Sequence, residues 1–477
     1  MKNQLFINGT WKNADDNSTF NLINPATEEV IAKLPNAGSK ETDAAIKSAR
    51  EGFKVWKNTN AFDRSKLLKR VAQKIRKKAK EYAKITTQES GKPLIESTGE
   101  WMIAADLFEW FAEEAKRTYG SVIPASRNNK RMQVIYQPMG VVGVITAWNF
   151  PIWNLARPWG AALSAGCSIV AKPSEETPLS ALLLTQIFES LSLPKGVINV
   201  VFGDAPKIGE ALMNASEVKK IHFVGSTKVG KLLLDKASIT NTKLSLELGG
   251  NAPVLIFPDI DVKQIAASSV TAKFRNCGQV CISPQRFLVH SDIYQEFVDE
   301  AAKHIAKYSI GNGMDATSQI GPLINKNQQN RLNNLIETSK QSGVKVVVGG
   351  KNHSENGKGY FFKPTLLSDV TENLSVFKNE IFGPIMTVSV FKSLEEGVNL
   401  ANKTEYGLAA YVWTNNLNTA IKVSEMIDFG IVGINEWTPH ATEAPFGGMK
   451  QSGQGSELGN DGIYEYLDKK LISIGSL

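Results

Sequence analysis

Short apolar runs alternate with stretches of helical periodicity through the first half of the chain. Strand-sized apolar runs lie at residues 141–146, 168–171, 197–202 and 220–224. Helix-like patterns follow the first two, at residues 152–165 and 178–191, and a glycine that leads into a further helix follows each of the others. This succession of strand and helix predicts an α/β fold with largely parallel sheets, as in many nucleotide-binding proteins.

The same alternation restarts after Gly250. A second set of strands is expected at residues 252–256, 285–290, 344–348 and 387–391, so we place a domain boundary near residues 249–251. Residues 120–139 alternate like a hairpin, and residues 470–474 have the pattern of an added edge strand. Outlying strands of this kind often pair across subunits, which predicts a homodimer or homotetramer.

Composition places the chain among ordinary globular proteins. With 477 residues, 42% of them hydrophobic and 21% charged, it is long enough for two or three domains. The net charge is +7, and the densest basic stretch, residues 66–84, has apolar positions at helical spacing. That stretch predicts an amphipathic helix with a solvated basic face, and no nucleic-acid recognition module accompanies it.

Membrane and secretory features are not expected either. No apolar run approaches the roughly 18 residues of a membrane span, and the first residues lack the apolar core of a signal peptide. Three cysteines are few for this length, which favours a reducing, cytoplasmic location. We therefore expect a small-molecule substrate and neither a nucleic-acid nor a membrane partner.

The thiols are the first candidates for chemistry. Cys277 and Cys281 lie in a polar, glycine-containing segment, and Glu247 sits in an apolar, strand-like run upstream. A thiolate can attack a carbonyl and a carboxylate can activate water, so the two groups suffice for covalent acyl chemistry. Cys167 begins an apolar strand and is expected to be a buried, inert thiol. The five histidines are scattered, so we expect no metal site.

Polar groups also follow several predicted strands. Asn149 could donate to an oxyanion, although asparagine there also makes turns. Lys172 and Glu175 could hold two ribose hydroxyls, or could lie in a solvated loop. The Gly225–Gly230 turn would point backbone N–H groups at an anion, a weak signal alone. Glu380 precedes a turn, where a single acid usually has no special role.

Taken in order, these segments resemble the aldehyde dehydrogenase superfamily from about Leu5 onward. The resemblance is carried by W-N-F-P at 148–151, K-P-S-E at 172–175, G-S-T-x-x-G at 225–230, E-L-G-G at 247–250, G-Q-x-C at 278–281, E-I-F-G-P at 380–384 and P-F-G-G at 445–448. It implies a Rossmann-type cofactor domain, an α/β catalytic domain and a small β oligomerisation element. The expected divisions are a cofactor domain at 1–119 and 140–249, a catalytic domain at 250–432, an active-site segment at 433–454 that returns to the cofactor domain, and an oligomerisation element at 120–139 and 455–477.

The resemblance also assigns roles to single residues. It implies that Cys281 is the nucleophile, that Glu247 activates the deacylating water, and that Asn149 and the Cys281 N–H form the oxyanion hole. The cofactor, NAD or NADP, would be bound by Trp148, Lys172, Ser174, Glu175, Gly203, Gly225, Ser226, Glu380 and Phe382. Glu175 would bond to a free ribose 2′-hydroxyl and repel a 2′-phosphate, which favours NAD, while Lys172 leaves NADP use open.

Within the superfamily the chain is most similar to succinate-semialdehyde dehydrogenases, on residues 273–276, 432–436 and 462–467. There, two arginines bind the substrate carboxylate, and Arg157 and Arg275 match them; a guanidinium fork suits a carboxylate. The chain departs from that pattern at Trp153, Trp437 and His440, which also suit a hydroxylated or sugar-derived aldehyde such as lactaldehyde, glyceraldehyde or an anhydro-sugar aldehyde.

The expected reaction is therefore NAD(P)-dependent oxidation of a small polar aldehyde to the acid through a cysteine thioester. Two further classes stay open at this point. Acyl transfer to coenzyme A is one, against which Glu247 argues because a water-activating base favours hydrolysis. An inactive structural paralogue is the other, although every chemical group is present.

Overall fold

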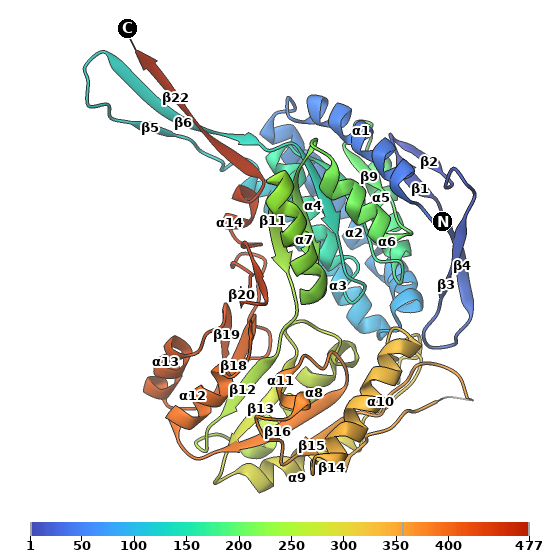
Figure 1. The fold of residues 1–477 in the computed structure, drawn as a ribbon, viewed down its shortest axis with the longest axis vertical. Helices are drawn as coiled ribbons and strands as arrows, with labels where there is room; N and C mark the ends of the chain where they lie inside the picture. The colour runs from blue at the N-terminus through green and yellow to red at the C-terminus, as the bar shows by residue number, and fades with distance from the viewer. Residues whose placement is uncertain (1, 355–356, 476–477) are drawn as a thin grey trace.

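The chain forms two α/β blocks, one above the other, with a narrow arm of strands that projects from the upper block (Figure 1). The computed structural model describes residues 2–354 and 357–475. Each block is built on one mixed, mainly parallel sheet, so the predicted α/β fold is confirmed. The chain passes from the first sheet to the second between Glu247 and Ala252, where the alternation of the sequence restarts.

The first sheet has the doubly wound order β9-β8-β7-β10-β11 at its centre, with these five strands parallel. Ligands bind such sheets beyond the carboxyl ends of the strands, where the order reverses; here that point lies between β7 and β10. β1, β2 and β21 extend the edges in the antiparallel sense. The strands are β1 (Leu5–Ile7), β2 (Thr10–Lys12), β7 (Val141–Ile145), β8 (Ser168–Lys172), β9 (Ile198–Val200), β10 (Val218–Val224), β11 (Lys243–Glu247) and β21 (Gly453–Gln454).

Helices from the first half of the described chain pack around this sheet. The predicted basic helix is confirmed and is longer than expected: Asn60 caps its start by accepting the Asp63 N–H at 3.0 Å, and Gly91 ends it at φ +79°. Its stripe at Leu68, Val71 and Ile75 is fully buried. The helices are α1 (Ser39–Trp56), α2 (Ala61–Ser90), α3 (Leu94–Glu114), α4 (Trp153–Ala165), α5 (Pro178–Glu189), α6 (Ala205–Asn214) and α7 (Thr227–Thr240).

The second sheet has the order β14-β15-β16-β13-β12-β18-β19, with only β14 antiparallel to its neighbour. Its strands are β12 (Ala252–Ile256), β13 (Pro284–His290), β14 (Lys345–Val348), β15 (Thr365–Ser368), β16 (Ile385–Phe391), β18 (Ala409–Trp413) and β19 (Ile431–Ile434). Its helices are α8 (Val262–Phe274), a 3₁₀ turn η1 (Arg275–Gly278), α9 (Tyr294–Ile305), α10 (Lys326–Gln341), α11 (Ser375–Lys378), α12 (Leu394–Asn402) and α13 (Leu417–Met426).

The projecting arm consists of the predicted hairpin and the C-terminal strand. β5 (Ser121–Ile123) and β6 (Lys130–Pro138) form the hairpin, and β22 (Leu467–Gly475) pairs with β6 along its whole length, so both predictions are confirmed. Val122 on β5 is 85% exposed and Leu471 on β22 is 60% exposed. Apolar side chains and an open strand edge at the end of an arm are typical of a surface that pairs with another chain.

Further short elements complete the fold, and like β1, β2, β15, β18, β19 and β21 they were not predicted from the sequence pattern. They are β3 (Thr19–Ile23), β4 (Val30–Pro35), β17 (Tyr406–Gly407), β20 (Met449–Lys450) and α14 (Asp461–Tyr464). β20 pairs with β17 of the lower block and β21 pairs with β11 of the upper block, with Gly453 opposite Glu247. This returning segment ties the two blocks together beside the end of β11. Within the described residues, no helix is long and apolar enough to cross a membrane.

Candidate active site

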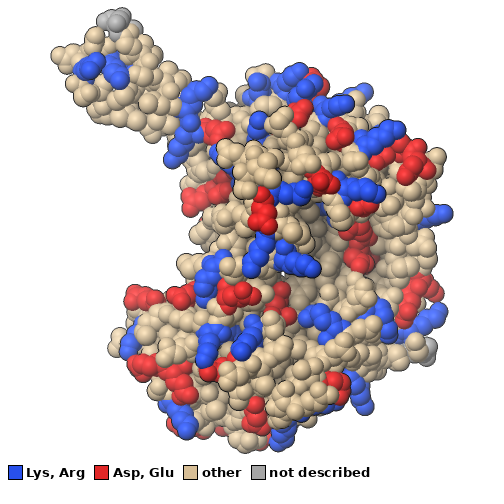
Figure 2. Space-filling view, in the orientation of Figure 1, with Lys and Arg blue, Asp and Glu red and all other residues tan. Residues whose placement is uncertain are grey.

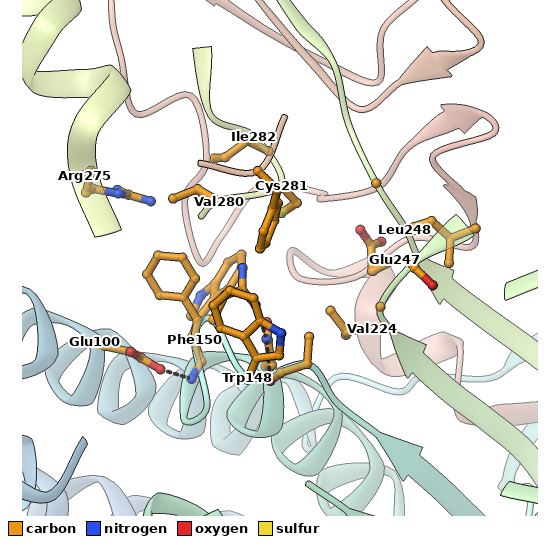
Figure 3. A pocket seen from close by; sticks show the side chains of 18 of the residues that line it. Glu100, Trp148, Phe150, Val224, Glu247, Leu248, Arg275, Val280, Cys281 and Ile282 are labelled. Carbon is orange, nitrogen blue, oxygen red and sulfur yellow. Dashed lines mark hydrogen bonds between the residues drawn. The ribbon is translucent and has the colours of Figure 1, made fainter. Parts of the chain in front are cut away.

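A cavity of about 440 Å³ lies where the carboxyl ends of β7 and β10 face loops of the lower block. The surface is hollowed between the two blocks (Figure 2), and side chains from both line the interior (Figure 3). Residues singled out from the sequence that line it are Trp148, Asn149, Trp153, Arg157, Gly225, Ser226, Glu247, Arg275, Cys281, Glu380, Phe382 and His440. Lys172, Ser174, Glu175, Gly203 and Trp437 lie outside it.

Cys281 faces the cavity from the loop between η1 and β13, whereas Cys277 is buried behind it, 1% exposed. The loop turns sharply because Asn276 and Cys277 adopt left-handed φ angles of 49° and 56°. Gly278 follows at φ +69°, and a Cβ there would lie 2.2 Å from the Gly383 carbonyl oxygen. Burial raises the pKa of the Cys281 thiol to about 12, partly offset by the positive charge of Arg157.

Glu247 ends β11 and is 4% exposed. Its Oε2 has no hydrogen-bond partner among the described residues, so this oxygen is not engaged within the protein. Burial, and then the negative charge of Glu457, raise its pKa well above the usual value. Figure 3 shows Glu247 and Arg275 on opposite sides of the cavity with Cys281 between them. A carboxyl group with this placement can reach a water beside the thiol.

The Asn149 side chain makes one hydrogen bond through its amide nitrogen and one through its amide oxygen. Its Nδ2 donates to the Gln279 carbonyl at 3.1 Å, and its Oδ1 accepts from Asn154 Nδ2 at 3.2 Å. An amide NH₂ has two N–H groups, so one remains for a ligand. The Cys281 main-chain N–H likewise has no hydrogen bond within the described parts of the chain. Two donors are thus left beside the thiol, as an oxyanion hole requires.

Arg157 reaches the cavity from α4, but most of its guanidinium is already engaged. Its Nη1 pairs with Glu457, and its Nη2 donates to Asn154 Oδ1 at 3.2 Å. Its Nε is buried without a partner among the residues described. Glu457 also lies 2.8 Å from His222 Nε2, and burial holds the pKa of His222 well below its usual value, so that imidazole is neutral.

Arg275, by contrast, makes no ion pair in the described structure. Its guanidinium carbon lies 5.5 Å from the centre of the Phe150 ring. His440 also lines the cavity, and burial together with the charges of Arg275 and Arg157 lowers its pKa to about 4. Trp153 packs against His440 with ring centres 5.8 Å apart. Trp437 turns away and packs 4.8 Å from Trp413 and 5.4 Å from Tyr411.

Two groups of residues are placed to hold a cofactor. In the cavity, Trp148 meets Phe382 edge-on at 5.5 Å, and Glu380 Oε1 accepts the Gly250 N–H at 2.9 Å. Burial raises the Glu380 pKa to about 7. Ser226 caps α7 by accepting the Val229 N–H at 3.4 Å, so the positive helix end faces the cavity rim.

The second group lies outside the cavity, at the end of β8. Lys172 forms an ion pair with Glu175, whose side chain is 33% exposed, and Ser174 is buried beside them. Gly203 follows β9 at φ +143°. A Cβ there would lie 2.3 Å from the Ala37 nitrogen, so glycine is required at this position because the backbone at Ala37 packs against it. Carboxylates, a lysine and a helix N-terminus are suitable partners for the ribose hydroxyls and pyrophosphate of a dinucleotide, so these residues fit NAD or NADP.

Several buried polar residues at this site escaped the sequence interpretation. Glu457 is remote in sequence and sits among ordinary loop residues, so no local pattern marks it. Gln279 binds both the cysteine loop and Ile324, whose N–H it accepts at 3.0 Å. Lys92, Glu96 and Glu100 share a spacing of four residues, which places Glu96 and Glu100 on one helix face. In the sequence, that spacing was the only indication that these residues act together.

Residues 11–472 match the aldehyde dehydrogenase family. The chain is 42% identical to the mitochondrial succinate-semialdehyde dehydrogenase of Arabidopsis thaliana, over 100% of this chain and 90% of that protein. It is 40% identical to a 3-sulfolactaldehyde dehydrogenase of Pseudomonas putida, over 100% and 98%. The crystal structure of succinate-semialdehyde dehydrogenase from Burkholderia pseudomallei has a TM-score of 0.97 at 40% identity, over 100% and 98% of the two chains. The chain therefore belongs to the aldehyde dehydrogenase family.

Proposed function

We propose that this NAD(P)-dependent enzyme, which oxidises a small polar aldehyde to its acid, acts on a semialdehyde whose far end carries a carboxylate. The observation that carries the proposal is Arg275, a cavity-lining guanidinium with no ion pair among the described residues. Glu96 is near enough to interact with Arg275 electrostatically but forms no ion pair with it, so the guanidinium keeps its hydrogen-bond donors and can bind a carboxylate with two parallel hydrogen bonds. Arg157 also lines the cavity, but its Nη1 pairs with Glu457 and its Nε is buried, so Arg275 is the principal carboxylate contact that we propose.

The first chemical step falls to Cys281 and Asn149. After the Cys281 thiol has lost its proton to water, the thiolate attacks the aldehyde carbon; a C–S bond forms, the π bond of the carbonyl breaks and the carbonyl oxygen becomes an oxyanion. The free N–H of Asn149 and the Cys281 N–H donate to that oxyanion. When bound, the nicotinamide cofactor supplies the acceptor for the two electrons and hydrogen that leave the carbon, and a thioester on Cys281 remains.

Glu247 carries the second step. Its carboxylate takes a proton from a water molecule as that water attacks the thioester carbon. The C–S bond breaks, the acid leaves, and the sulfur is released for another cycle. Because burial and the negative charge of Glu457 raise the Glu247 pKa, the fraction of Glu247 in the base-competent carboxylate form grows as pH rises.

The cofactor preference follows from Glu175. Its carboxylate, one-third exposed and paired with Lys172, can accept a hydrogen bond from a free 2′-hydroxyl and repels a 2′-phosphate. We therefore favour NAD over NADP. Lys172 partly cancels the repulsion, so the preference is expected to be one of degree.

A subunit arrangement and a domain division accompany this proposal. We infer a cofactor domain at 1–119 and 140–249, a catalytic domain at 250–432, a returning segment at 433–454, and an oligomerisation element at 120–139 and 455–477. The exposed apolar arm supports a homodimer or homotetramer. All three thiols are free, which supports a reducing compartment such as the cytoplasm.

A matched substrate panel tests the proposal. Succinate semialdehyde and butyraldehyde have the same carbon number but differ in the terminal carboxylate, and lactaldehyde and glyceraldehyde carry hydroxyls instead. We expect the highest kcat/KM for succinate semialdehyde, with free acid as the product even when coenzyme A is added. A higher kcat/KM for butyraldehyde or for the hydroxyaldehydes would contradict the assignment of a carboxylated substrate. A coenzyme A thioester would contradict the role of Glu247.

A further inference from the structure

The two loops that carry Asn149 and Cys281 come from different blocks, yet both are attached to one short stretch of chain, residues 92–100. This stretch contains the turn after α2 and the first turns of α3. It supplies three charged side chains to the back of the cavity, Lys92, Glu96 and Glu100. None of them is expected to touch the reacting carbonyl, so their contacts call for a separate explanation.

Lys92 binds the Asn149 loop directly. Its Nζ donates to the Asn149 carbonyl oxygen at 2.7 Å and to Glu100 Oε2 at 2.6 Å, and it lies 4.0 Å from the centre of the Phe150 ring. The side chains of Lys92 and Glu100 are 0% and 1% exposed. Charge-assisted hydrogen bonds in such a dry setting are short and directional, so they restrict the position of the Asn149 backbone.

Glu100 binds the other end of the same loop. Its Oε1 accepts the N–H groups of Ile152 at 2.8 Å and Trp153 at 3.1 Å, at the start of α4. The residue at the N-cap of α4, Ile152, has no side chain that can cap the helix. Glu100 thus takes the place of a local cap and fixes where α4 begins. Figure 3 shows Glu100 reaching the loop below the cavity.

Glu96 binds the cysteine loop. Its Oε2 accepts the Asn276 N–H at 2.9 Å, at the strained turn that precedes Cys277. Asn276 in turn donates from Nδ2 to the Asn149 carbonyl at 2.9 Å, the same oxygen that Lys92 holds. The Asn149 loop and the cysteine loop, which are distant in sequence, are therefore joined in two ways: through the Asn149 carbonyl oxygen, and through their shared contacts with the first turns of α3.

We propose that Lys92, Glu96 and Glu100 act as positioning residues that fix the Asn149 amide relative to the Cys281 sulfur. The oxyanion hole is useful only if the amide N–H reaches the oxygen of the same carbonyl group whose carbon the sulfur attacks, and a displacement of about 1 Å can lower a rate by about 10²-fold. The inference rests on the roles proposed for Asn149 and Cys281. It goes beyond them because it assigns a function to residues outside the reacting set.

A stability role alone does not account for this arrangement. A buried ion pair contributes little net stability, and neutral residues of similar shape often replace it without loss. The chain contains a suitable comparison: Glu89, on α2, is also buried and accepts the N–H groups of Leu179 at 2.7 Å and Ser180 at 2.9 Å, at the start of α5. Glu89 caps a helix in the same way as Glu100 but does not hold the Asn149 loop.

The test uses the paired variant Lys92→Met/Glu100→Gln, which removes both charges together and keeps the side-chain volumes, with Glu89→Gln as the matched control. The full-length enzyme is mixed rapidly with saturating cofactor and aldehyde, and cofactor reduction is followed at 340 nm. We expect the rate of the first turnover to fall about 10- to 100-fold in the paired variant, with KM for cofactor changed less than about twofold. The single variant Lys92→Arg, which keeps the positive charge, should have a first-turnover rate between those of the paired variant and the wild type. The control Glu89→Gln should have the wild-type first-turnover rate. An unchanged first-turnover rate in the paired variant would overturn the inference.

A double-mutant cycle separates this inference from the roles on which it depends. Lys92 acts through the Asn149 amide, so combining Lys92→Met with Asn149→Ala should slow the first turnover little more than Asn149→Ala alone. Additive losses would show that Lys92 acts elsewhere and would overturn the inference while leaving the Asn149 role intact. A full first-turnover rate in Asn149→Ala alone would instead overturn the proposed role of Asn149. Thermal unfolding of every variant reports whether a loss of rate follows a loss of fold.

Discussion

Arg157 and Glu457 form a buried ion pair that joins the wall of the cavity to the interior of the upper block. Arg157 is 2% exposed and Glu457 is 5% exposed, and the two residues come from α4 and from the segment that returns after β21. The pair has two consequences for the catalytic groups. Arg157 lowers the pKa of Cys281, and Glu457 raises the pKa of Glu247.

Replacing Glu457 with glutamine should move the pH dependence of turnover to lower pH. In the mechanism that we propose, Glu247 must be deprotonated to activate water, and the negative charge of Glu457 is the largest cause after burial of its raised pKa. Removing that charge lowers the Glu247 pKa. The carboxylate therefore forms at lower pH, and kcat begins to rise at a lower pH than in the wild type. The measurement is kcat against pH between about 5.5 and about 9.5 under conditions where hydrolysis limits turnover. A profile that stays in place or moves to higher pH would refute this coupling.

Replacing Glu247 with glutamine should separate the two chemical steps. The neutral amide of the Glu247→Gln variant cannot accept the water proton, and general-base catalysis typically contributes about 10²- to 10⁴-fold. We expect a burst of reduced cofactor near one equivalent per active site, followed by turnover slowed by about that factor. Rapid mixing with detection at 340 nm measures both phases. Loss of the burst together with turnover would mean that Glu247 is needed before the thioester forms.

Replacing Arg275 with glutamine should weaken the enzyme only toward carboxylated aldehydes. A hydrogen bond to a charged group contributes about 1.5–3 kcal/mol, which corresponds to about a 10- to 150-fold fall in kcat/KM for succinate semialdehyde. Butyraldehyde lacks the carboxylate and should be oxidised at nearly the wild-type rate by the same variant. An equal fall for both aldehydes would point to a structural effect of the substitution and not to carboxylate binding.

Replacing Glu175 with glutamine should narrow the preference between the two cofactors. In the cofactor position that we propose, the variant loses the charge that would repel a 2′-phosphate, while Lys172 is released from its ion pair and could bind that phosphate. We expect KM for NADP to fall and KM for NAD to rise. Steady-state kinetics with each cofactor at saturating aldehyde provide the measurement. Opposite or absent changes would show that Glu175 does not contact the 2′ position.

The parallel strands at the centre of the first sheet, and β12, β13 and β16 of the second, follow from the sequence because buried parallel strands leave continuous apolar runs, as in β7 and β12. The sequence pattern did not predict β15, β18 and β19 of the second sheet. The expected catalytic groups that line the cavity also lie at the ends of strands or in glycine turns, where the chain pattern marks them. Trp437 shows the limit of this reasoning: its position in the segment 437–442 predicts a place in the pocket, but its ring packs against Trp413 and Tyr411. Which face of an irregular loop points inward depends on tertiary packing, which local pattern does not encode.

The polar groups behind the cavity could not be inferred for a related reason. Glu457, Lys92 and Glu100 reach the site through contacts between residues far apart in sequence, such as the bond from Lys92 to the Asn149 carbonyl. The role of a buried charged residue depends on which group it pairs with, and the fold determines that partner, so the sequence alone does not reveal the role. The same is true of Arg157. The sequence predicts that its guanidinium binds the substrate carboxylate, and only the structure shows that it already forms an ion pair with Glu457.

Selective thiol labelling tests the electrostatic link between Arg157 and Cys281. Only the thiolate reacts with iodoacetamide, and burial raises the Cys281 pKa to about 12, so the labelling rate should rise about tenfold per pH unit between about pH 7 and about pH 9. Cys167 and Cys277 are buried and should label more slowly, as peptide mass spectrometry can determine.

The variant Arg157→Met/Glu457→Gln removes the charge that lowers the Cys281 pKa while it leaves neither partner of the buried ion pair as an unpaired charge. We expect slower labelling of Cys281 in this variant at each pH. Arg275→Met is the matched control, because Arg275 is not among the charges that shift the Cys281 pKa, and it should label at the wild-type rate. Equal labelling rates in the wild type and the Arg157 variant would rule out this role of Arg157.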